Sequence, residues 1–243
     1  APAAEAMGGG VRAAICYAGH LRSFFHKQIR ENHIDNLLGP LNQAGIRTDV
    51  FMAVGRGDCM RSYSCSPGSG ESERATALGF RSEAKLSSEV EVVLDPEKEP
   101  LMSGATINGI LNSQCPHIAR KPWSGWGVAS LWARVRKCYE LVEAREEREG
   151  FQYDLIIRLR PDNFFVQPSE PKPLFQLLHP EKDTRPVIIT PPHEFVGNGG
   201  INDWAAACRR DHCKGYFRAI DLWERCIPPH AAGKNSSKGG WGG

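Results

Sequence analysis

The chain has 243 residues, of which 41% are hydrophobic and 24% are charged, and its net charge is +2. This is the composition of an ordinary globular protein, and so small a net charge gives no reason to expect nucleic acid or a membrane surface as a partner. No apolar run approaches the roughly 20 residues that a membrane-spanning helix needs.

The first part of the chain predicts a β-α-β unit. Residues 11–19 are a short apolar run that ends in a glycine turn, which is typical of a strand. Residues 23–41 are predicted to form a helix, whose end is marked by Gly39-Pro40 and Gly45. Residues 48–54 are the next predicted strand. Two strands joined through a helix predict a parallel pair with a right-handed crossover.

The middle of the chain continues this alternation. Residues 55–72 are rich in Gly, Ser and Cys and are predicted to form a long loop. Residues 90–96 form a third predicted strand. Residues 127–149 give the clearest helix, because their apolar side chains recur on one face and Gly150 follows directly.

The second half adds two strands, over residues 153–160 and 186–192, and an amphipathic helix around residues 216–223. Strands that alternate with helices predict an α/β fold with a mostly parallel central sheet flanked by helices, in one Rossmann-like domain.

The predicted organisation is a single domain over residues 11–230. It lies between two segments that we expect to be flexible, residues 1–10 and the Gly/Ser-rich residues 231–243.

The eight cysteines favour an oxidising compartment, because an even count at this density is typical of disulfide-bonded proteins. Two pairs are close enough in sequence to close small loops, namely Cys59 with Cys65 and Cys208 with Cys213.

Cys16 and Cys138 lie in apolar segments and are interpreted as buried thiols that pack like small hydrophobic residues. A structural zinc site that uses Cys208, His212 and Cys213 is a weaker alternative, since the chain contains no Cys-x-x-Cys pair.

The strand over residues 153–160 carries the main functional signal. Side chains alternate across a strand, so Ile156, Arg158 and Arg160 share one face. Leu155, Ile157 and Leu159 share the other face, and the apolar character of both faces predicts a central strand that is covered on both sides. Pro161 ends the strand and Asp162 follows it. Ligands bind at the carboxyl ends of the strands in such sheets, so these polar side chains are delivered to the usual ligand position.

The chemistry of these side chains suits a nucleoside diphosphate. Guanidinium groups match phosphate oxygens, and an aspartate beside phosphates suits a divalent cation. The alternative is an internal ion-pair network without a ligand, which would join Arg158 or Arg160 to Asp162 or Asp154.

Three blocks of this sequence resemble a group of eukaryotic and viral glycosyltransferase-like proteins of the GT-A type. The central block, "LWARVRKCYELVEAREEREGFQYDLIIRLRPDNFF", contains their YD-x-x-x-R-x-R-x-D-x-x-F pattern. The block "VRAAICYAGHLRSF" resembles their first strand and its Gly-x-x-Arg turn. The block "GNGGINDWAAACRRD" resembles their late G-x-N-D segment.

The resemblance implies a GT-A fold with a nucleotide-sugar as co-substrate. In that fold a strand-end Asp-x-Asp motif holds a divalent cation, Mn²⁺ or Mg²⁺, against the diphosphate. Here Arg160 replaces the first acidic residue and only Asp162 remains as a metal ligand. The metal requirement is therefore open, because Arg158 or Arg160 could supply part of the cation's charge.

The resemblance also assigns roles in donor binding. Gly19, His20 and Arg22 follow the first strand, where GT-A proteins hold the nucleotide, and Arg22 is assigned to phosphate or base contacts. The alternative for Arg22 is a surface arginine at a helix start. Asn202 is assigned to the same donor site.

Asp203 is the candidate general base, since a transfer with inversion needs a group that takes the proton of the acceptor hydroxyl. The alternative for Asp203 is the N-cap of a helix that begins with "WAAACRR". His193 and Glu194 are second-choice bases.

Tryptophan side chains could form a platform for a sugar ring. The candidates are Trp123, Trp126 and Trp204, whereas Trp132 and Trp223 lie on apolar helix faces and are predicted to pack in the core.

The sequence thus predicts a hexosyl- or pentosyltransferase that moves a sugar from a nucleotide-diphosphate donor to a hydroxyl of a glycan or glycoprotein acceptor. We expect it in the lumen of the secretory pathway, in the Golgi or the ER. The alternative is a non-catalytic module that binds a nucleotide or sugar on the same fold.

Overall fold

The structure is a computed structural model that describes residues 10–55, 71–84, 90–94, 125–178, 188–189 and 204–224. Its strands are β1 (Arg12–His20), β2 (Arg47–Gly55), β3 (Val90–Leu94), β4 (Leu155–Leu159), β5 (Ile188–Ile189) and β6 (Ala205–Arg209). They form one sheet in the order β3-β2-β1-β4-β6-β5. Strands β1 to β4 are parallel, and β6 runs antiparallel to β4 and β5.

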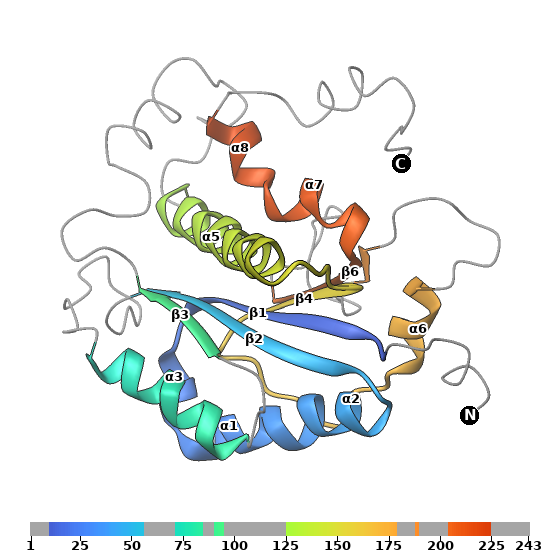
Figure 1. Cartoon of the computed structure of the whole chain (residues 1–243). Coiled ribbons are helices and arrows are strands. Elements are labelled where there is room, and N and C mark those ends of the chain that lie inside the picture. Colours follow the sequence, from blue (N-terminus) through green and yellow to red (C-terminus); the bar gives the residue numbers. More distant parts are fainter. Residues whose placement is uncertain are drawn as a thin grey trace.

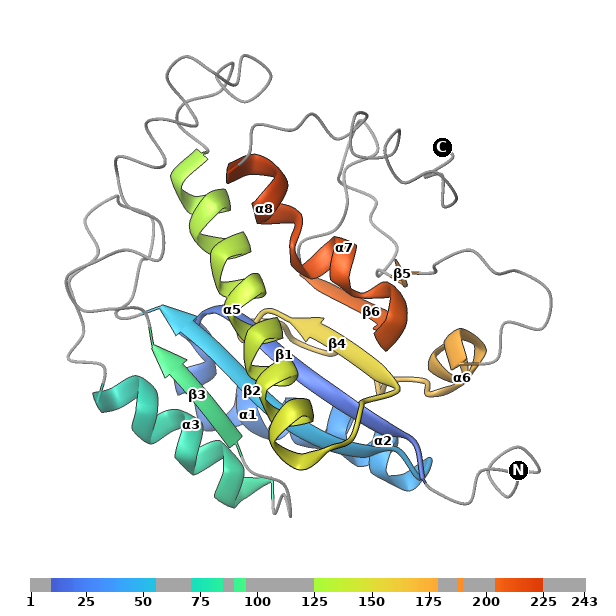
Figure 2. The same cartoon turned by 45° about the horizontal axis from the view of Figure 1, so that its top comes forward.

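Helices cover both faces of this sheet (Figure 1). The main helices are α1 (Lys27–His33), α2 (Gly39–Gln43), α3 (Glu71–Glu83), α5 (Gly125–Glu149), α6 (Lys172–Leu178), α7 (Lys214–Phe217) and α8 (Ala219–Glu224). Short turns are η1 (Arg22–Phe25), the π-helical η2 (Ile34–Leu38) and η3 (Arg210–His212). Figure 2 shows α5, α7 and α8 over one face, with α1, α2 and α3 on the other. The predicted α/β architecture is confirmed, and it is compatible with a Rossmann-like fold.

Strand β4 lies in the interior of the sheet, between β1 and β6, and all five of its residues are buried. Leu155 and Leu159 belong to the core that faces α1 and α3. Ile156 belongs to the core beneath α5. The predicted alternation of this strand, and its burial on both faces, are therefore confirmed.

Helix α5 buries the stripe that its sequence predicts. Val135, Tyr139 and Val142 are fully buried against β1 and β2. Trp132 is partly buried and packs edge-on against Tyr216 of α7, as expected for a core position.

The helix predicted over residues 23–41 forms in pieces. His26 is extended and separates η1 from α1. Gly39-Pro40 does not end the helix, because Pro40 occupies the first turn of α2, where its missing N–H costs no hydrogen bond. The π-helical turn η2 precedes α2, and the backbone N–H of Gly39 donates to the carbonyl of Ile34, five residues earlier. Helix α2 therefore continues directly from this turn. The helical run ends at Gly45, which has a left-handed φ of +80°.

Three described elements were not predicted, namely α3, α6 and β6. The alternative of a helix beginning with "WAAACRR" is wrong, because Ala205–Arg209 form β6. Alanine favours helices, but here the backbone pairs with β4, and the small side chains fit under the covering helices. Tertiary pairing thus overrides the local preference.

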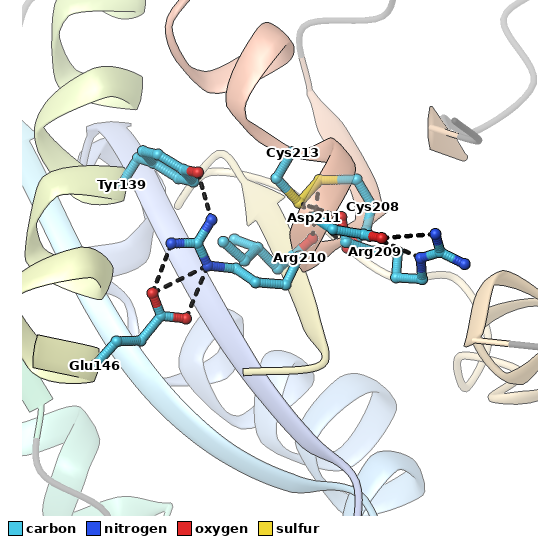
Figure 3. The surroundings of a disulfide bond; sticks show 8 residues. Tyr139, Glu146, Cys208, Arg209, Arg210, Asp211 and Cys213 are labelled. Carbon is cyan, nitrogen blue, oxygen red and sulfur yellow. Dashed lines mark hydrogen bonds and ion pairs between the residues drawn. A yellow bond between two sulfur atoms is a disulfide. The ribbon is translucent and has the colours of Figure 1, made fainter. Parts of the chain in front are cut away.

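Two disulfides are present among the described residues. Cys208 and Cys213 form the predicted small loop, with a Cα–Cα distance of 5.4 Å (Figure 3). Their sulfurs are bonded to each other and so are not thiolate ligands for zinc. Cys16 of β1 and Cys138 of α5 are buried as predicted but are bonded, so their interpretation as free thiols is wrong. Sequence could not reveal this contact across 122 residues.

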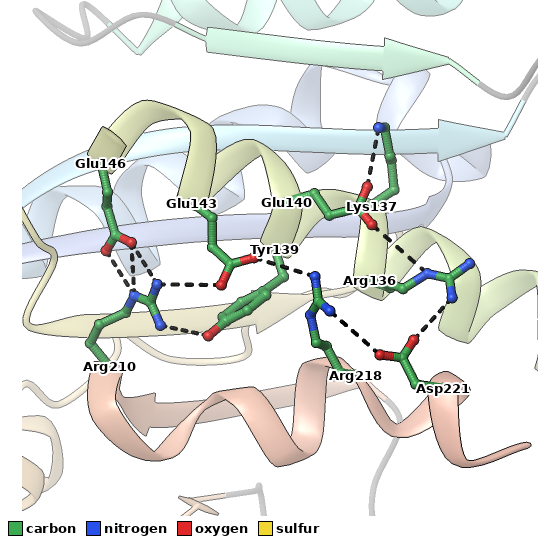
Figure 4. Close-up of polar contacts among 9 residues, drawn as sticks. All are labelled: Arg136, Lys137, Tyr139, Glu140, Glu143, Glu146, Arg210, Arg218 and Asp221. Carbon is green, nitrogen blue, oxygen red and sulfur yellow. Dashed lines mark hydrogen bonds and ion pairs between the residues drawn. The ribbon is translucent and has the colours of Figure 1, made fainter. Parts of the chain in front are cut away.

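Polar side chains hold α7 and α8 against α5 (Figure 4). Arg210 donates to both carboxylate oxygens of Glu146 and to the hydroxyl of Tyr139. Further along, Arg136 pairs with Asp221 at 2.9 Å. These ion pairs fix the helical layer beneath which β4 and β6 lie. None of the described helices is both long and apolar enough to cross a membrane.

Candidate functional site

The candidate site lies where β1 and β4 end side by side. In the sheet, β2 and β3 lie on one side of β1, and β4 lies on the other side. The strand order therefore reverses between β1 and β4. In doubly wound sheets, ligands bind at the carboxyl ends of the two strands where the order reverses. Gly19 marks the contact between these ends. Its φ is +148°, and a Cβ atom there would lie 3.3 Å from Cδ of Pro161. A side chain at this position would press against Pro161, and the positive φ would strain the backbone of any residue other than glycine.

Two arginines converge on one carboxylate at this position. Arg160 follows β4 and donates to Asp162 through Nε at 2.9 Å and through Nη2 at 2.7 Å. Arg22 follows β1 and donates to the same carboxylate through Nη1 at 3.0 Å. We refer to Arg22, Asp162 and Arg160 as the switch-point cluster. The structure therefore brings together three of the predicted site residues, from segments 140 residues apart.

The charge state of Asp162 follows from its neighbours. Burial raises the pKa of this carboxyl, but the hydrogen bonds and positive charges of Arg160 and Arg22 outweigh burial, so the pKa is lowered overall. Asp162 is therefore a carboxylate at neutral pH. The predicted internal ion pair between Arg160 and Asp162 is present. Asp154 has another role, since it accepts a hydrogen bond from the backbone N–H of Arg12.

Arg22 has a strained backbone. Its φ of +42° is left-handed, and it is the one non-glycine residue with a positive φ among those described. A non-glycine residue in this region costs roughly 1–3 kcal/mol, and such strain clusters at functional sites. The side chain of Arg22 is 37% exposed, although its Nε is buried and makes no hydrogen bond with the described residues. The exposed part of the Arg22 side chain is therefore accessible to a ligand while Nη1 binds Asp162.

Two buried arginines lie on the α5 side of the sheet. Arg158 of β4 is only 1% exposed and lies beside Cys16 in the strand register. Arg134 of α5 is 6% exposed, and its Nη2 would lie 2.8 Å from a Cβ atom on Gly55, at the end of β2. The ring of His20 covers the same glycine, since its Cε1 would lie 2.5 Å from that Cβ atom. Gly55 therefore makes room for the side chains of Arg134 and His20.

Arg134 was missed at the sequence level, although a signal was available. It precedes Cys138 by four residues and so lies on the buried stripe of a helix. A charged residue on such a stripe indicates either an ion pair or a ligand contact.

A buried histidine holds the loop that carries Asp162. The ring of His33 is fully buried and lies between the hydroxyl of Tyr17, at 2.9 Å, and the carbonyl of Asn163, at 2.8 Å. Nε2 must donate to the carbonyl, so Nδ1 accepts from the tyrosine. Next to this bridge, Asn32 exchanges two hydrogen bonds with the backbone of Phe165. The loop after β4 is thereby fixed to α1, and Asp162 is held within it. No pattern in the sequence indicates this bridge, because it joins residues 130 positions apart.

We expect this bridge to make stability depend on pH. Burial lowers the pKa of His33 from 6.5 to about 4, although the Asn163 carbonyl and the charge of Asp162 oppose the shift. The unfolded chain therefore binds the proton more readily than the folded one. The free energy of unfolding should be unaffected above pH 6.5 and fall between pH 6.5 and 4, by up to about 1.4 kcal/mol per pH unit.

Urea unfolding at a series of pH values checks this dependence. His33→Gln can keep both hydrogen bonds but does not titrate, and should flatten the profile in that window. The matched control is His26→Gln, since His26 is solvent-exposed. An unchanged profile in His33→Gln would contradict the assignment.

Trp204 lies beside the switch-point cluster, immediately before β6. Its carbonyl accepts hydrogen bonds from the backbone N–H of Arg160 and from Nδ2 of Asn163. Its indole ring is half exposed, and the guanidinium of Arg160 lies 5.9 Å from the ring centre. Phe164 is also exposed, on the loop after β4. Of the three candidate platforms, Trp204 is the one whose side chain the structure describes.

The remaining predicted site residues lie outside the described part of the chain, and the structure does not test them. They are His193, Glu194, Asn202 and Asp203. The same holds for Trp123, for the side chains of Trp126 and Trp223, and for Cys59 and Cys65. The predicted terminal segments, 1–10 and 231–243, fall almost entirely outside it as well.

The described residues do not fit a divalent cation at Asp162. Both carboxylate oxygens already accept hydrogen bonds from guanidinium groups. Within the described ranges, no group of three or more His, Cys, Asp or Glu side chains is arranged to hold a metal ion.

The chain matches no family model and no curated protein. The function has to be inferred from the chemistry of the site itself.

Proposed function

We propose that the chain is a nucleotide-sugar-dependent glycosyltransferase of the GT-A type, which moves a hexosyl or pentosyl group to a hydroxyl of a glycan or glycoprotein. The observation that carries this proposal is the switch-point cluster, two arginines on one carboxylate at the ends of β1 and β4. That is the ligand position of a doubly wound sheet, and guanidinium groups bind phosphate oxygens in pairs of hydrogen bonds.

The proposed reaction is a displacement at the anomeric carbon. The bond between this carbon and the diphosphate oxygen breaks, and a bond to the acceptor oxygen forms. The electron pair of the broken bond leaves with the diphosphate, where negative charge grows. Arg22 and Arg160 would stabilise that charge, which is the kind of preorganised electrostatic effect that contributes most to catalysis. The acceptor proton would pass to a base, for which Asp203 is the first candidate and His193 and Glu194 the second.

The surroundings of the cluster agree with this proposal. Arg134 of α5 reaches Gly55 at the end of β2, on the same side of the strand ends. The strand order β3-β2-β1-β4, with an antiparallel β6 beside β4, gives a Rossmann-like sheet of the kind on which the GT-A proposal relies. The two disulfides are compatible with the lumen of the secretory pathway, which we propose as the location.

The sugar platform is proposed to be Trp204. Its exposed ring offers an apolar face next to charged hydrogen-bonding groups, which is the combination that carbohydrates need. We expect Trp204→Ala to raise the KM for the acceptor or donor sugar about tenfold, because aromatic stacking contributes roughly 0.5–1.5 kcal/mol.

Steady-state kinetics on donor and acceptor separately would measure this effect. Leu78→Ala is a suitable control, since Leu78 is equally exposed but lies on α3. An unchanged KM for both substrates in Trp204→Ala would remove this residue from the site.

One observation favours a second candidate, a non-catalytic module that binds a nucleotide or sugar. Asp162 is the one carboxylate that the described residues place at the cluster, and two arginines hold it. Such a carboxylate is a poor base, because its pKa is lowered. As such a module, the protein would bind the nucleotide-sugar at this site without transferring its sugar.

Thermal unfolding with a panel of nucleoside diphosphates and nucleotide-sugars tests the proposal first. A ligand present at 100 times its dissociation constant stabilises the folded state by about 2.7 kcal/mol, which is easily visible. Stabilisation by one nucleotide class would identify the donor, and sugar transfer or slow hydrolysis of that donor would separate the enzyme from the binding module. If no nucleotide stabilises the chain, the proposed function is wrong and the switch-point cluster is a structural ion pair.

A further inference from the structure

We propose that Arg22 and Arg160 bind the donor diphosphate without a divalent cation, and that Asp162 positions these two arginines instead of ligating a metal. This inference rests on the proposed function and specifies how its site holds the leaving group. It departs from the expectation that a strand-end aspartate serves as a metal ligand.

The first argument is the geometry of the carboxylate. Oδ1 of Asp162 accepts from Nε of Arg160 at 2.9 Å, and Oδ2 accepts from Nη2 of Arg160 at 2.7 Å and from Nη1 of Arg22 at 3.0 Å. A metal ion binds a carboxylate oxygen at about 2.0–2.6 Å. At that distance it would occupy the space of these hydrogen bonds, with a guanidinium group on either side. Both arginines would have to leave before a cation could bind.

The second argument is the balance of charge. A divalent cation is used at diphosphate sites because it neutralises phosphate charge. Arg22 and Arg160 bring two positive charges to the same carboxylate at the ends of β1 and β4. They can therefore supply to a diphosphate part of the charge that a cation would supply.

The third argument is that the arginines are held in advance. Arg160 binds Asp162 with a two-point fork, which fixes the plane of its guanidinium group. Arg22 is placed by a strained left-handed backbone, and its side chain is 37% exposed. The loop of Asp162 is itself fixed, through Asn163 and buried His33. Asp162 thus holds the guanidinium groups of Arg22 and Arg160 in fixed positions. Each guanidinium group could then bind the oxygens of one phosphate of the diphosphate.

The test is to measure binding of uridine, guanosine and cytidine diphosphates by titration calorimetry, once in EDTA and once in excess MnCl₂. We expect the diphosphate that binds to have the same dissociation constant, within threefold, in both conditions. Arg22→Asn should weaken this binding at least tenfold in both. Asparagine tolerates the left-handed backbone, so this variant removes the guanidinium group of Arg22 without adding backbone strain.

Asp162→Asn separates the two roles of the aspartate. It removes the charge that holds both guanidinium groups, so the dissociation constant should change by the same factor in EDTA and in MnCl₂, whichever its direction. A metal ligand would behave differently, because the variant would then lose at least tenfold in affinity, and only in MnCl₂. Unfolding curves of both variants establish that they are folded at the assay temperature.

The outcomes are distinct for the two proposals. Binding that requires MnCl₂ and is lost in Asp162→Asn overturns the metal-free site and leaves the proposed function intact. Binding of a diphosphate in EDTA that Arg22→Asn does not weaken also overturns it, since the site must then lie elsewhere. If none of the diphosphates binds in either condition, the proposed function fails, and this inference fails with it.

Discussion

Replacing Arg160 with methionine is expected to weaken binding of the nucleoside diphosphate about 100-fold, which corresponds to about 2.7 kcal/mol. The reason is that Arg160 has the most constrained guanidinium of the switch-point cluster, held by two hydrogen bonds to Asp162 and lying over the ring of Trp204. Hydrogen bonds to charged groups contribute roughly 1.5–3 kcal/mol each. Methionine keeps most of the apolar stem and removes the charge. Calorimetric titration of the diphosphate measures the change.

The chain offers a closely matched control at the opposite end of the same strand pair. Arg209 of β6 pairs with Asp211 through the same two-point fork, with distances of 2.7 and 2.6 Å. It lies opposite Leu155, at the amino end of β4, away from the cluster. Arg209→Met should therefore leave diphosphate binding unchanged. Equal losses in both variants would mean that the effect of Arg160→Met arises from altered folding or overall charge.

The second large effect is expected on stability. Replacing Cys16 and Cys138 together with alanine should lower the free energy of unfolding by about 5 kcal/mol, because the disulfide closes a loop of 122 residues in the unfolded chain. The bond also ties β1 to α5, one turn from Arg134. Chemical unfolding of the oxidised protein and of the double variant gives the difference.

The other described disulfide serves as the control for loop length. Cys208 and Cys213 are equally buried but only five residues apart. Their replacement with alanine should lower the free energy of unfolding by about 2 kcal/mol in the same chain-entropy estimate. The two double variants should thus differ by about 3 kcal/mol. Equal losses would show that packing and not the length of the closed loop determines the contribution of these bonds.

Local patterns predicted much of the fold. The apolar periodicity of α5 and the alternation of β4 depend on spacings of three to four and of two residues, which are visible along the chain. They led directly to Arg160 and Asp162 at the end of a central strand, and to Arg22 after β1. By contrast, β6 was missed because its alanines favour a helix until β4 is available as a partner.

The sequence by itself determined the alternation of strands and helices and the central position of β4. It also determined that Arg22, Arg160 and Asp162 lie just beyond the ends of two strands. Only the tertiary structure decided that Cys16 bonds to Cys138 and that His33 holds the loop of Asp162. It also decided that Arg22, 140 residues away, binds the carboxylate of Asp162 on which the metal prediction relied. The physical reason is that these contacts join residues more than 100 positions apart, and no local spacing encodes which distant groups will meet.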